Sequence, residues 1–123
     1  MALCDIFLPS IDDITALNGM ADADAVVDWG HAAGAKAVVL KQGGDGPVAS
    51  DGSRRERIAP HRVQLVDATG AGDCFAGNLL ARMASGDDVF TAARYANAAA
   101  ALAVQGWGAV APLPRPEAVK ALL

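Results

Sequence analysis

Cysteine, histidine and aromatic residues are all scarce in this chain, and their scarcity excludes several kinds of protein. The two cysteines, Cys4 and Cys74, stand far apart without CxxC spacing, so neither a disulfide framework nor a zinc site is expected. The two histidines, His31 and His61, form no metal-ligand pattern and are expected at the surface. Aromatic residues make up only 5% of the chain, so Ala, Val and Leu carry most of its hydrophobicity.

Long apolar runs and clusters of one charge are also missing. The longest apolar run, residues 98–104, falls well short of a bilayer span, and the amino terminus lacks the basic flank and apolar stretch of a signal peptide. The net charge of −4 argues against a nucleic-acid partner, because clustered Lys and Arg hold backbone phosphates. The one basic stretch, Arg54–Arg57, is short and interrupted by an acid, which is typical of a solvated edge. We therefore expect a cytoplasmic protein that binds neither membrane nor nucleic acid.

The first part of the chain predicts alternating strands and helices. With 123 residues, 53% of them hydrophobic, the chain can bury one core, and one compact layered domain is expected. Short apolar runs at residues 5–8 and 35–40 predict buried strands. Between them, Ser10 is expected to cap a short helix that ends at Gly19, and Asp22 to cap a second helix.

The rest of the chain predicts a hairpin and then helices. The glycine turn at residues 42–47, with short runs after it, indicates antiparallel strands. Residues 63–66 predict a further strand or an extended segment, followed by helices over about 73–85 and 87–104 and a final short helix after three prolines. This order indicates an α/β fold with a mostly parallel sheet covered by helices and an antiparallel hairpin at one edge.

The segment from Thr69 to Asp73 carries the clearest chemical signal. Gly70, Ala71 and Gly72 leave the backbone uncovered where a helix begins, so unpaired N–H groups and the helix dipole make an anion site. Asp73, in the first helical turn, is either a plain helix cap or a carboxylate that accepts a proton from an attacking hydroxyl. The glycines alone do not separate these two readings. Neither a Walker loop nor a dinucleotide fingerprint fits the residues that follow.

This stretch closely resembles the signature of the ribokinase-like, or PfkB, family of carbohydrate kinases, Asp-x-x-Gly-Ala-Gly-Asp-x-Phe. The matching residues are Asp67, Gly70, Ala71, Gly72, Asp73 and Phe75. The resemblance implies an anion hole for the transferring phosphoryl group at Gly70, Ala71 and Gly72. It also implies that Asp73 is the general base, which takes the proton from the primary alcohol of a sugar.

The resemblance assigns ATP binding to three segments. The residues concerned are Lys41, Gly43, Gly46, Asn97, Gly106 and Gly108. The first three lie where the family has a strand-to-turn loop that lets ATP phosphates approach the backbone, although a solvated strand end explains Lys41 nearly as well. Asn97 lies in an Ala-rich stretch that resembles the helix beside the adenine pocket. The last two glycines lie in the following loop, which lines the nucleotide site.

The resemblance also implies two cations. Asp67 and Thr69 match positions that help to hold a monovalent cation, K⁺ being the candidate. Mg²⁺ is implied together with ATP, but the family's Pro-Asn-x-x-Glu segment is replaced here by Pro9–Asp13. Asp13 would therefore act on Mg²⁺ through water, and helix capping explains this acid without a metal.

The same Pro-Ser-x-x-Asp form, with the Gly-Ala-Val-Ala-Pro tail at residues 108–112, looks most like the 2-keto-3-deoxygluconate kinase branch of the family. That sugar acid is therefore the expected substrate. A kinase acting on ribose, fructose or a nucleoside is the alternative within the family.

The resemblance runs from Asp5 to about Val119 but covers only the later part of a family member. Residues 1–123 are therefore expected to be a carboxy-terminal ATP-binding and catalytic part, without the amino-terminal sugar-binding region and lid. Three readings stay open: one half of a kinase, a nucleotide-binding fragment without catalysis of its own, and a generic α/β domain with a capped turn. Association with a second copy or with the missing part is open as well.

Overall fold

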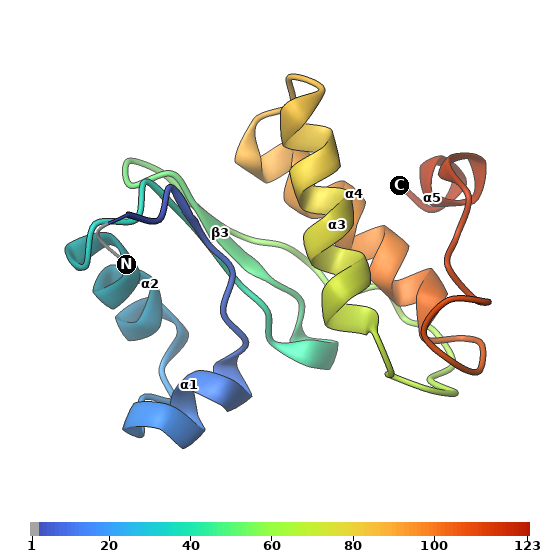
Figure 1. Cartoon of the computed structure of the whole chain (residues 1–123), viewed down its shortest axis with the longest axis horizontal. Coiled ribbons are helices and arrows are strands. Elements are labelled where there is room, and N and C mark those ends of the chain that lie inside the picture. The colour runs from blue at the N-terminus through green and yellow to red at the C-terminus, as the bar shows by residue number, and fades with distance from the viewer. Residues whose placement is uncertain (1–2) are drawn as a thin grey trace. The chain divides into compact units, whose positions relative to one another are not determined.

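The computed structural model describes residues 3–123 (Figure 1). The chain divides into two compact units, Met1–Ala59 and Pro60–Leu123. The first unit contains a four-stranded sheet with helices α1 and α2, and the second is built from helices α3, α4 and α5. Within the described residues, no helix is both long and apolar enough to cross a membrane.

The strands of the first unit follow one another in chain order across the sheet, β1-β2-β3-β4. They are β1 (Ile6–Phe7), β2 (Ala37–Leu40), β3 (Val48–Ser50) and β4 (Arg55–Arg57). β1 pairs with β2 in parallel, and α1 and α2 form the crossover that a parallel connection requires. β2–β3 and β3–β4 are antiparallel, so the hairpin lies at one edge as the sequence predicts.

The α/β class is confirmed, but the sheet of the described residues is mixed rather than mostly parallel. β1–β2 is its one parallel strand pair, extended by an isolated parallel bridge between Ser10 and Lys41. The connections after β2 and β3 are too short for crossovers, so those strands must turn back on their neighbours. Residues 63–66 form no strand; the main-chain N–H of Val66 instead donates to the carbonyl of Val104 at 2.8 Å.

Helices α1 (Ile11–Asn18) and α2 (Ala23–Ala32) begin at the predicted caps. The Ser10 hydroxyl accepts from the amide of Asp13, and the Asp22 carboxylate accepts from the amide of Ala25. Their apolar faces build a core with β2 and β3. The buried residues of this core are Ile14, Val26, Val27, Ala35, Val38, Leu40 and Val48. A Cβ at Gly30 would lie 2.9 Å from Val38, so glycine lets α2 approach the sheet closely.

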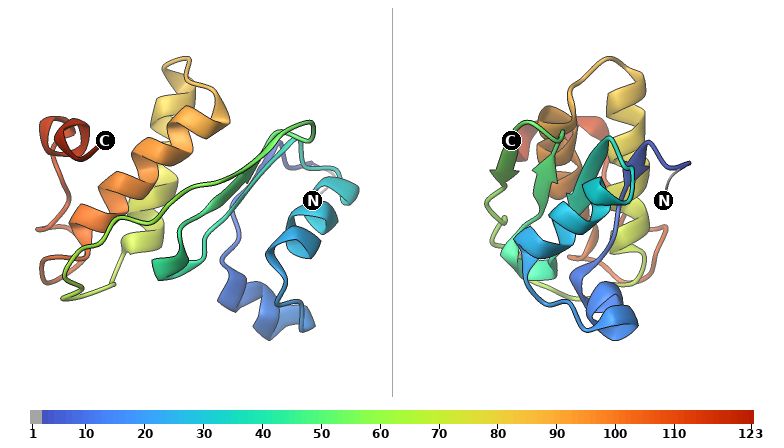
Figure 2. Two further views of the ribbon diagram at one scale, coloured as in Figure 1. Left: turned by 180° about the vertical axis from the view of Figure 1, so that it is seen from behind. Right: turned by 90° about the vertical axis from the view of Figure 1, so that its left-hand side faces the viewer.

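In the second unit, α3 (Ala71–Ala84) and α4 (Val89–Ala103) run side by side, joined by a short connection (Figures 1 and 2). α5 (Pro116–Leu122) packs against α4. The small alanine side chains buried along α4 allow close helix packing, which compensates for the shortage of aromatic residues. Part of the core of this unit consists of Cys74, Tyr95, Ala98, Ala99, Ala103 and Val119.

Candidate active site

The turn that enters α3 depends on glycine at position 70. Gly70 is the N-cap of α3 and has φ 76°, the left-handed conformation that glycine adopts without strain. A Cβ at this position would lie 2.9 Å from the Cβ of Ala109. The backbone of the glycine loop is therefore in direct contact with the loop that follows α4, and any side chain would push the two apart.

Main-chain amides are exposed where α3 begins. The N–H groups of Gly70, Gly72 and Asp73 have no acceptor within the described part of the chain. The N–H of Ala71 differs from the prediction, because it donates to the carbonyl of Ala68 at 3.1 Å. Unpaired amides at a helix start carry partial positive charge, and they suit a phosphate oxygen.

The Asp73 carboxylate lies in the first turn of α3 beside these amides. Its side chain is exposed and makes no hydrogen bond or ion pair within residues 3–123. It borders a hollow of about 390 Å³ between the first turns of α3 and the loop after α4. The lining residues are Gly70, Asp73, Cys74, Gly77, Asn78, Ala109, Val110 and Leu113. A carboxylate that neither caps its own helix nor pairs with a cation is free to accept a proton from a bound hydroxyl.

Asp67 fastens the glycine loop to the loop after α4. One carboxylate oxygen accepts from the amide and the hydroxyl of Thr69 at 2.9 and 2.6 Å, and the other accepts from the amide of Gly108 at 2.9 Å. These hydrogen bonds lower the pKa of Asp67, the Thr69 hydroxyl contributing most. The carboxylate thus acts as an internal clamp, and the predicted K⁺ role of Asp67 and Thr69 stays a prediction.

The loop after α4 is shaped by a second close approach. A Cβ at Gly106 would lie 2.7 Å from Pro112, so this glycine is required by packing, as Gly70 is. Trp107 between the two predicted nucleotide-binding glycines is 77% exposed and does not belong to the core. Asn97 is half-buried on α4, among buried alanines.

In the first unit, the predicted phosphate loop is a turn between β2 and β3. It contains a short 3-10 helix, η1 (Gly43–Asp45), and both Gly43 and Gly46 have positive φ, 58° and 81°. Lys41 is half-buried. Its main-chain N–H donates to the carbonyl of Pro9, and its carbonyl accepts from the N–H of Ile11, each at 2.9 Å. The sequence did not single out Gln42, whose side-chain amide spans the turn to the carbonyl of Gly46 at 3.0 Å.

Asp13 stands in the first turn of α1 with an exposed side chain. Among residues 3–123, no group of three or more His, Cys, Asp or Glu side chains gathers into a metal site. A Mg²⁺ ion near Asp13 would therefore need phosphate oxygens and water for most of its ligands, which is the usual situation for this cation.

Cys74 and His31 have defined structural roles. Cys74 is buried under the start of α3, and burial raises the pKa of its thiol, so a reactive thiolate is not favoured there. The sequence predicted His31 at the surface, but its side chain is half-buried. Its two ring nitrogens are hydrogen-bonded to the carbonyl of Ala35 and to the hydroxyl of Ser50. Its partner Ser50 comes from a strand distant in sequence, so no local pattern could reveal the contact.

The predicted residues fall into two groups. Asp13, Lys41, Gly43 and Gly46 belong to the first unit, and Asn97 on α4 belongs to the second. The second unit brings together Asp67, Thr69, the residues 70–73, Gly106 and Gly108 around one pair of loops. The fold and these loops define an α/β protein with unpaired main-chain amides and an unpaired carboxylate at the start of one helix.

The chain belongs to the pfkB family of carbohydrate kinases, whose family model matches residues 1–116. It is 38% identical to a ribokinase from Bacillus subtilis over 84 residues, which are 68% of this chain and 29% of that protein. It is 31% identical to a 2-dehydro-3-deoxygluconokinase from Escherichia coli K12, over 88% of this chain and 36% of that protein. The chain thus spans about a third of the length of these relatives.

Solved structures show the same fold. The ribokinase of Thermotoga maritima superposes with a TM-score of 0.89 at 27% identity, over 96% of this chain and 41% of that one. An aminoimidazole riboside kinase from Salmonella enterica, solved with aminoimidazole riboside and an ATP analogue, gives 0.88 at 29% identity, over 98% of this chain and 42% of that one. The ribokinase-like fold expected from the sequence is confirmed.

Proposed function

We propose that this chain is the ATP-binding and catalytic part of a kinase that phosphorylates a hydroxyl group of a small sugar or sugar acid. The observation that carries the proposal is the pairing, at the start of α3, of exposed amides with an unpartnered Asp73 carboxylate. Membership of the pfkB family supports the same reaction class. The fit is chemical: the amides complement a phosphoryl group, and the carboxylate complements the proton that the alcohol must lose.

In the proposed step, Asp73 accepts the proton of the sugar hydroxyl while the hydroxyl oxygen forms a bond to the γ-phosphorus of ATP. The bond between that phosphorus and the bridging oxygen breaks, and ADP leaves. The amides of Gly70, Gly72 and Asp73 stabilise negative charge on the transferring group, a contribution that needs donors fixed in place before the reaction. The packing of Gly70 against Ala109 and the Asp67 clamp supply that rigidity.

The substrate is proposed to be 2-keto-3-deoxygluconate. The support is the Pro9–Asp13 segment of the sequence and the likeness to 2-dehydro-3-deoxygluconokinases. Ribokinases match this chain as well, and one solved relative from Arabidopsis thaliana is described as a complex with ribose and ATP. Ribose, fructose or a nucleoside therefore remains the alternative within the same reaction class.

Lys41, Gly43, Gly46, Asn97, Gly106 and Gly108 are proposed to contact ATP, with Mg²⁺ on the phosphates and K⁺ near Asp67 and Thr69. Relatives support the cofactors: one ribokinase-like structure is described with ATP and Mg²⁺, and a Vibrio cholerae fructokinase with fructose, ADP and a potassium ion. Mg²⁺ would neutralise charge on the phosphates. The remaining sugar contacts are proposed to come from an amino-terminal sugar-binding region like that of the family.

A second candidate is a fragment that binds nucleotide but does not transfer phosphate by itself. The chain spans only about a third of its curated relatives, and the hollow beside Asp73 is lined by residues of the second unit alone. A site without its sugar-binding part would admit water and lack the contacts that orient the hydroxyl.

Calorimetry and turnover separate these candidates. The chain should bind ATP in competition with ADP, whereas a generic α/β domain would release no heat. In a turnover assay with the amino-terminal part of such a kinase present, Asp73→Asn should lower kcat by about 10²–10⁴-fold and leave ATP affinity unchanged. Asp5→Asn, which changes an exposed acid, is the matched control. Equal turnover in Asp73→Asn and the unaltered protein would remove Asp73 from the mechanism.

A further inference from the structure

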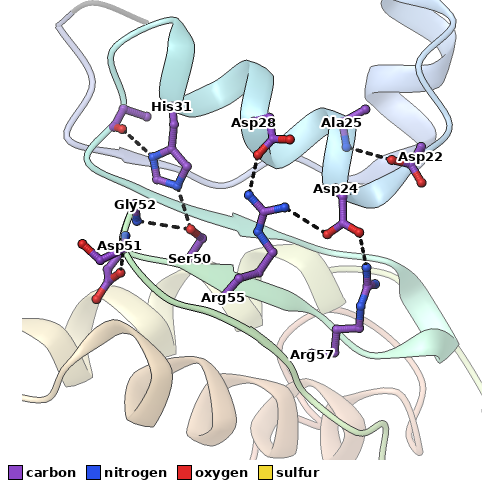
Figure 3. Close-up of polar contacts among 12 residues, drawn as sticks. Asp22, Asp24, Ala25, Asp28, His31, Ser50, Asp51, Gly52, Arg55 and Arg57 are labelled. Atoms are coloured by element: carbon purple, nitrogen blue, oxygen red, sulfur yellow. Dashed lines mark hydrogen bonds and ion pairs between the residues drawn. The ribbon is translucent and has the colours of Figure 1, made fainter.

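Helix α2 presents a polar line toward the β3–β4 hairpin. Asp24, Asp28 and His31 are spaced four and three residues apart, so they share one face of the helix. Figure 3 shows all three pointing toward the hairpin. The two hairpin residues opposite the aspartates, Arg55 and Arg57, are two positions apart on β4 and therefore lie on the same face of the sheet.

Two arginines and two aspartates form one continuous ionic network. Arg55 uses one guanidinium nitrogen for Asp24 at 3.0 Å and the other for Asp28 at 2.5 Å. The second oxygen of Asp24 receives Arg57 at 2.6 Å (Figure 3). The Arg55 side chain is only 31% exposed, and its hydrogen bond to Asp28 is the main cause that raises its pKa. A partly buried guanidinium that pairs with two carboxylates is fixed in orientation, whereas an isolated surface ion pair is not.

His31 anchors the other end of the hairpin. The carbonyl of Ala35 only accepts hydrogen bonds, so Nδ1 of the neutral ring carries the hydrogen and donates to it at 2.9 Å. Nε2 then accepts from the hydroxyl of Ser50 at 2.8 Å, and the Ser50 oxygen in turn accepts from the amide of Gly52 at 3.2 Å. The hairpin is therefore attached to α2 at Ser50 on β3 and at Arg55 and Arg57 on β4.

These attachments are transmitted to the β2–β3 turn, residues 41–47. Arg57 pairs across the ladder with Val48, the first residue after the turn, and the amide of Ile58 donates to the carbonyl of Pro47 at 2.9 Å. Inside the turn the main-chain hydrogen bonds are long: 3.2 Å from Asp45 to Gln42 and 3.5 Å from Gly46 to Gly43. One side-chain bond, from the amide of Gln42 to the carbonyl of Gly46 at 3.0 Å, also spans the turn. The main chain of the turn is thus held weakly by its own hydrogen bonds and depends on that side chain and on the flanking strands.

We propose that Arg55 and Arg57, held by Asp24 and Asp28, are positioning residues that fix the β2–β3 turn for nucleotide phosphates. The inference rests on the proposed function, which assigns this turn to ATP. Gly43 and Gly46, both with positive φ, make the turn adaptable. Ordering the turn around a phosphate therefore costs little entropy only if contacts outside the turn already hold the hairpin in place. The ion pairs of Arg55 and Arg57 with Asp24 and Asp28 provide that fixation, because Arg57 pairs with Val48 directly after the turn.

The test compares three forms of the chain: unaltered, Arg55→Gln, and Lys36→Gln as the control. Lys36 also pairs with an aspartate of the first unit, but at an exposed site outside the hairpin, so the control removes the same charge. Two quantities are measured, the affinity for ATP by calorimetry and the hydrogen-exchange rates of the amides at residues 43–46. Arg55→Gln should weaken ATP binding about five-fold and speed exchange in the turn, while the amides of β2 keep their protection. Lys36→Gln should change neither.

A charge exchange provides the rescue. The double variant Asp28→Arg with Arg55→Asp rebuilds the ion pair between positions 28 and 55 in the reverse direction but places a second carboxylate beside Asp24. It should therefore recover part of the lost affinity, which a general loss of folding would not allow. If Arg55→Gln fails to fold, Arg55→Lys keeps the charge but cannot fork between two carboxylates, and the same affinity loss is expected.

The outcomes distinguish failure of the proposed function from failure of the positioning role. If the unaltered chain binds neither ATP nor ADP, the proposed function fails, and this inference fails with it. If the unaltered chain binds ATP and Arg55→Gln binds it equally well with equal exchange at residues 43–46, only the positioning role is overturned.

Discussion

The carboxylate of Asp67 accepts a hydrogen bond from the main-chain amide of Gly108, 41 positions further along the chain, at 2.9 Å. This contact joins the loop before α3 to the loop after α4. It lies beside Gly70, whose backbone touches Ala109. The exposed amides at the start of α3 therefore depend on a contact between two loops that the helices α3 and α4 separate in sequence.

Replacing Asp67 should loosen that contact. In Asp67→Asn, the NH₂ group of the new side chain must face either the amide of Gly108 or the amide of Thr69. Both of these groups are hydrogen-bond donors, so one of the present hydrogen bonds is lost in either orientation. Hydrogen exchange at Gly108 should become faster and thermal stability should fall. Thr69→Val removes only the hydroxyl and should have a smaller effect. Unchanged exchange at Gly108 in Asp67→Asn would contradict the clamp.

Two glycines of the same region should respond in opposite directions to alanine. Gly70→Ala forces a left-handed conformation, at about 1–2 kcal/mol, and adds the clash with Ala109. Gly77→Ala, in the middle of α3 with open space around its Cβ position, should stabilise the helix by up to about 1 kcal/mol. Urea unfolding of both variants checks the pair. A neutral Gly70→Ala would mean that the loop after α4 is not packed as described.

Cys74 should be the less reactive of the two thiols. Burial raises its pKa, so less thiolate is present near neutral pH, and the side chain is also shielded from the reagent. Alkylation followed by mass spectrometry should label Cys4 before Cys74 in the folded chain, and both at similar rates in urea. Faster labelling of Cys74 would indicate that the start of α3 is open.

Asp51 should make the stability of the β3–β4 hairpin depend on pH. Two main-chain hydrogen bonds lower the pKa of this exposed carboxyl, the amide of Arg54 having the larger effect and the amide of Ser53 the smaller. Its folded pKa lies below the unfolded value of about 3.9, so the stabilisation is present above that value and is lost as pH falls through the folded pKa. Asp51→Asn keeps an acceptor oxygen but loses the charge.

The measurement for Asp51 is the free energy of unfolding of both forms at neutral pH and near pH 3. The unaltered chain should be the more stable at neutral pH, and the difference should shrink in acid. A difference that stays constant across this range would mean that the Asp51 charge does not contribute.

Several local features were predictable from neighbouring residues alone. The caps at Ser10 and Asp22 follow from side chains that reach an amide three positions away, and the left-handed end of α1 follows from Gly19. The mixed sheet was not predictable in the same way, because strand direction is set by which strands meet. The surface assignment of His31 failed for that reason too, since its partner Ser50 lies on β3.

By itself, the sequence determined where most helices begin, the α/β class, and the run from Asp67 to Phe75 that places the chain in its family. Those features depend on side chains a few residues apart, whose interactions exist before the chain has folded. Only the tertiary structure decided that Asp67 clamps Gly108, that Gly70 must lack a side chain because of Ala109, and that α2 holds the hairpin through Arg55. Such contacts join segments that come together only when burial of the apolar core brings distant strands and helices into register.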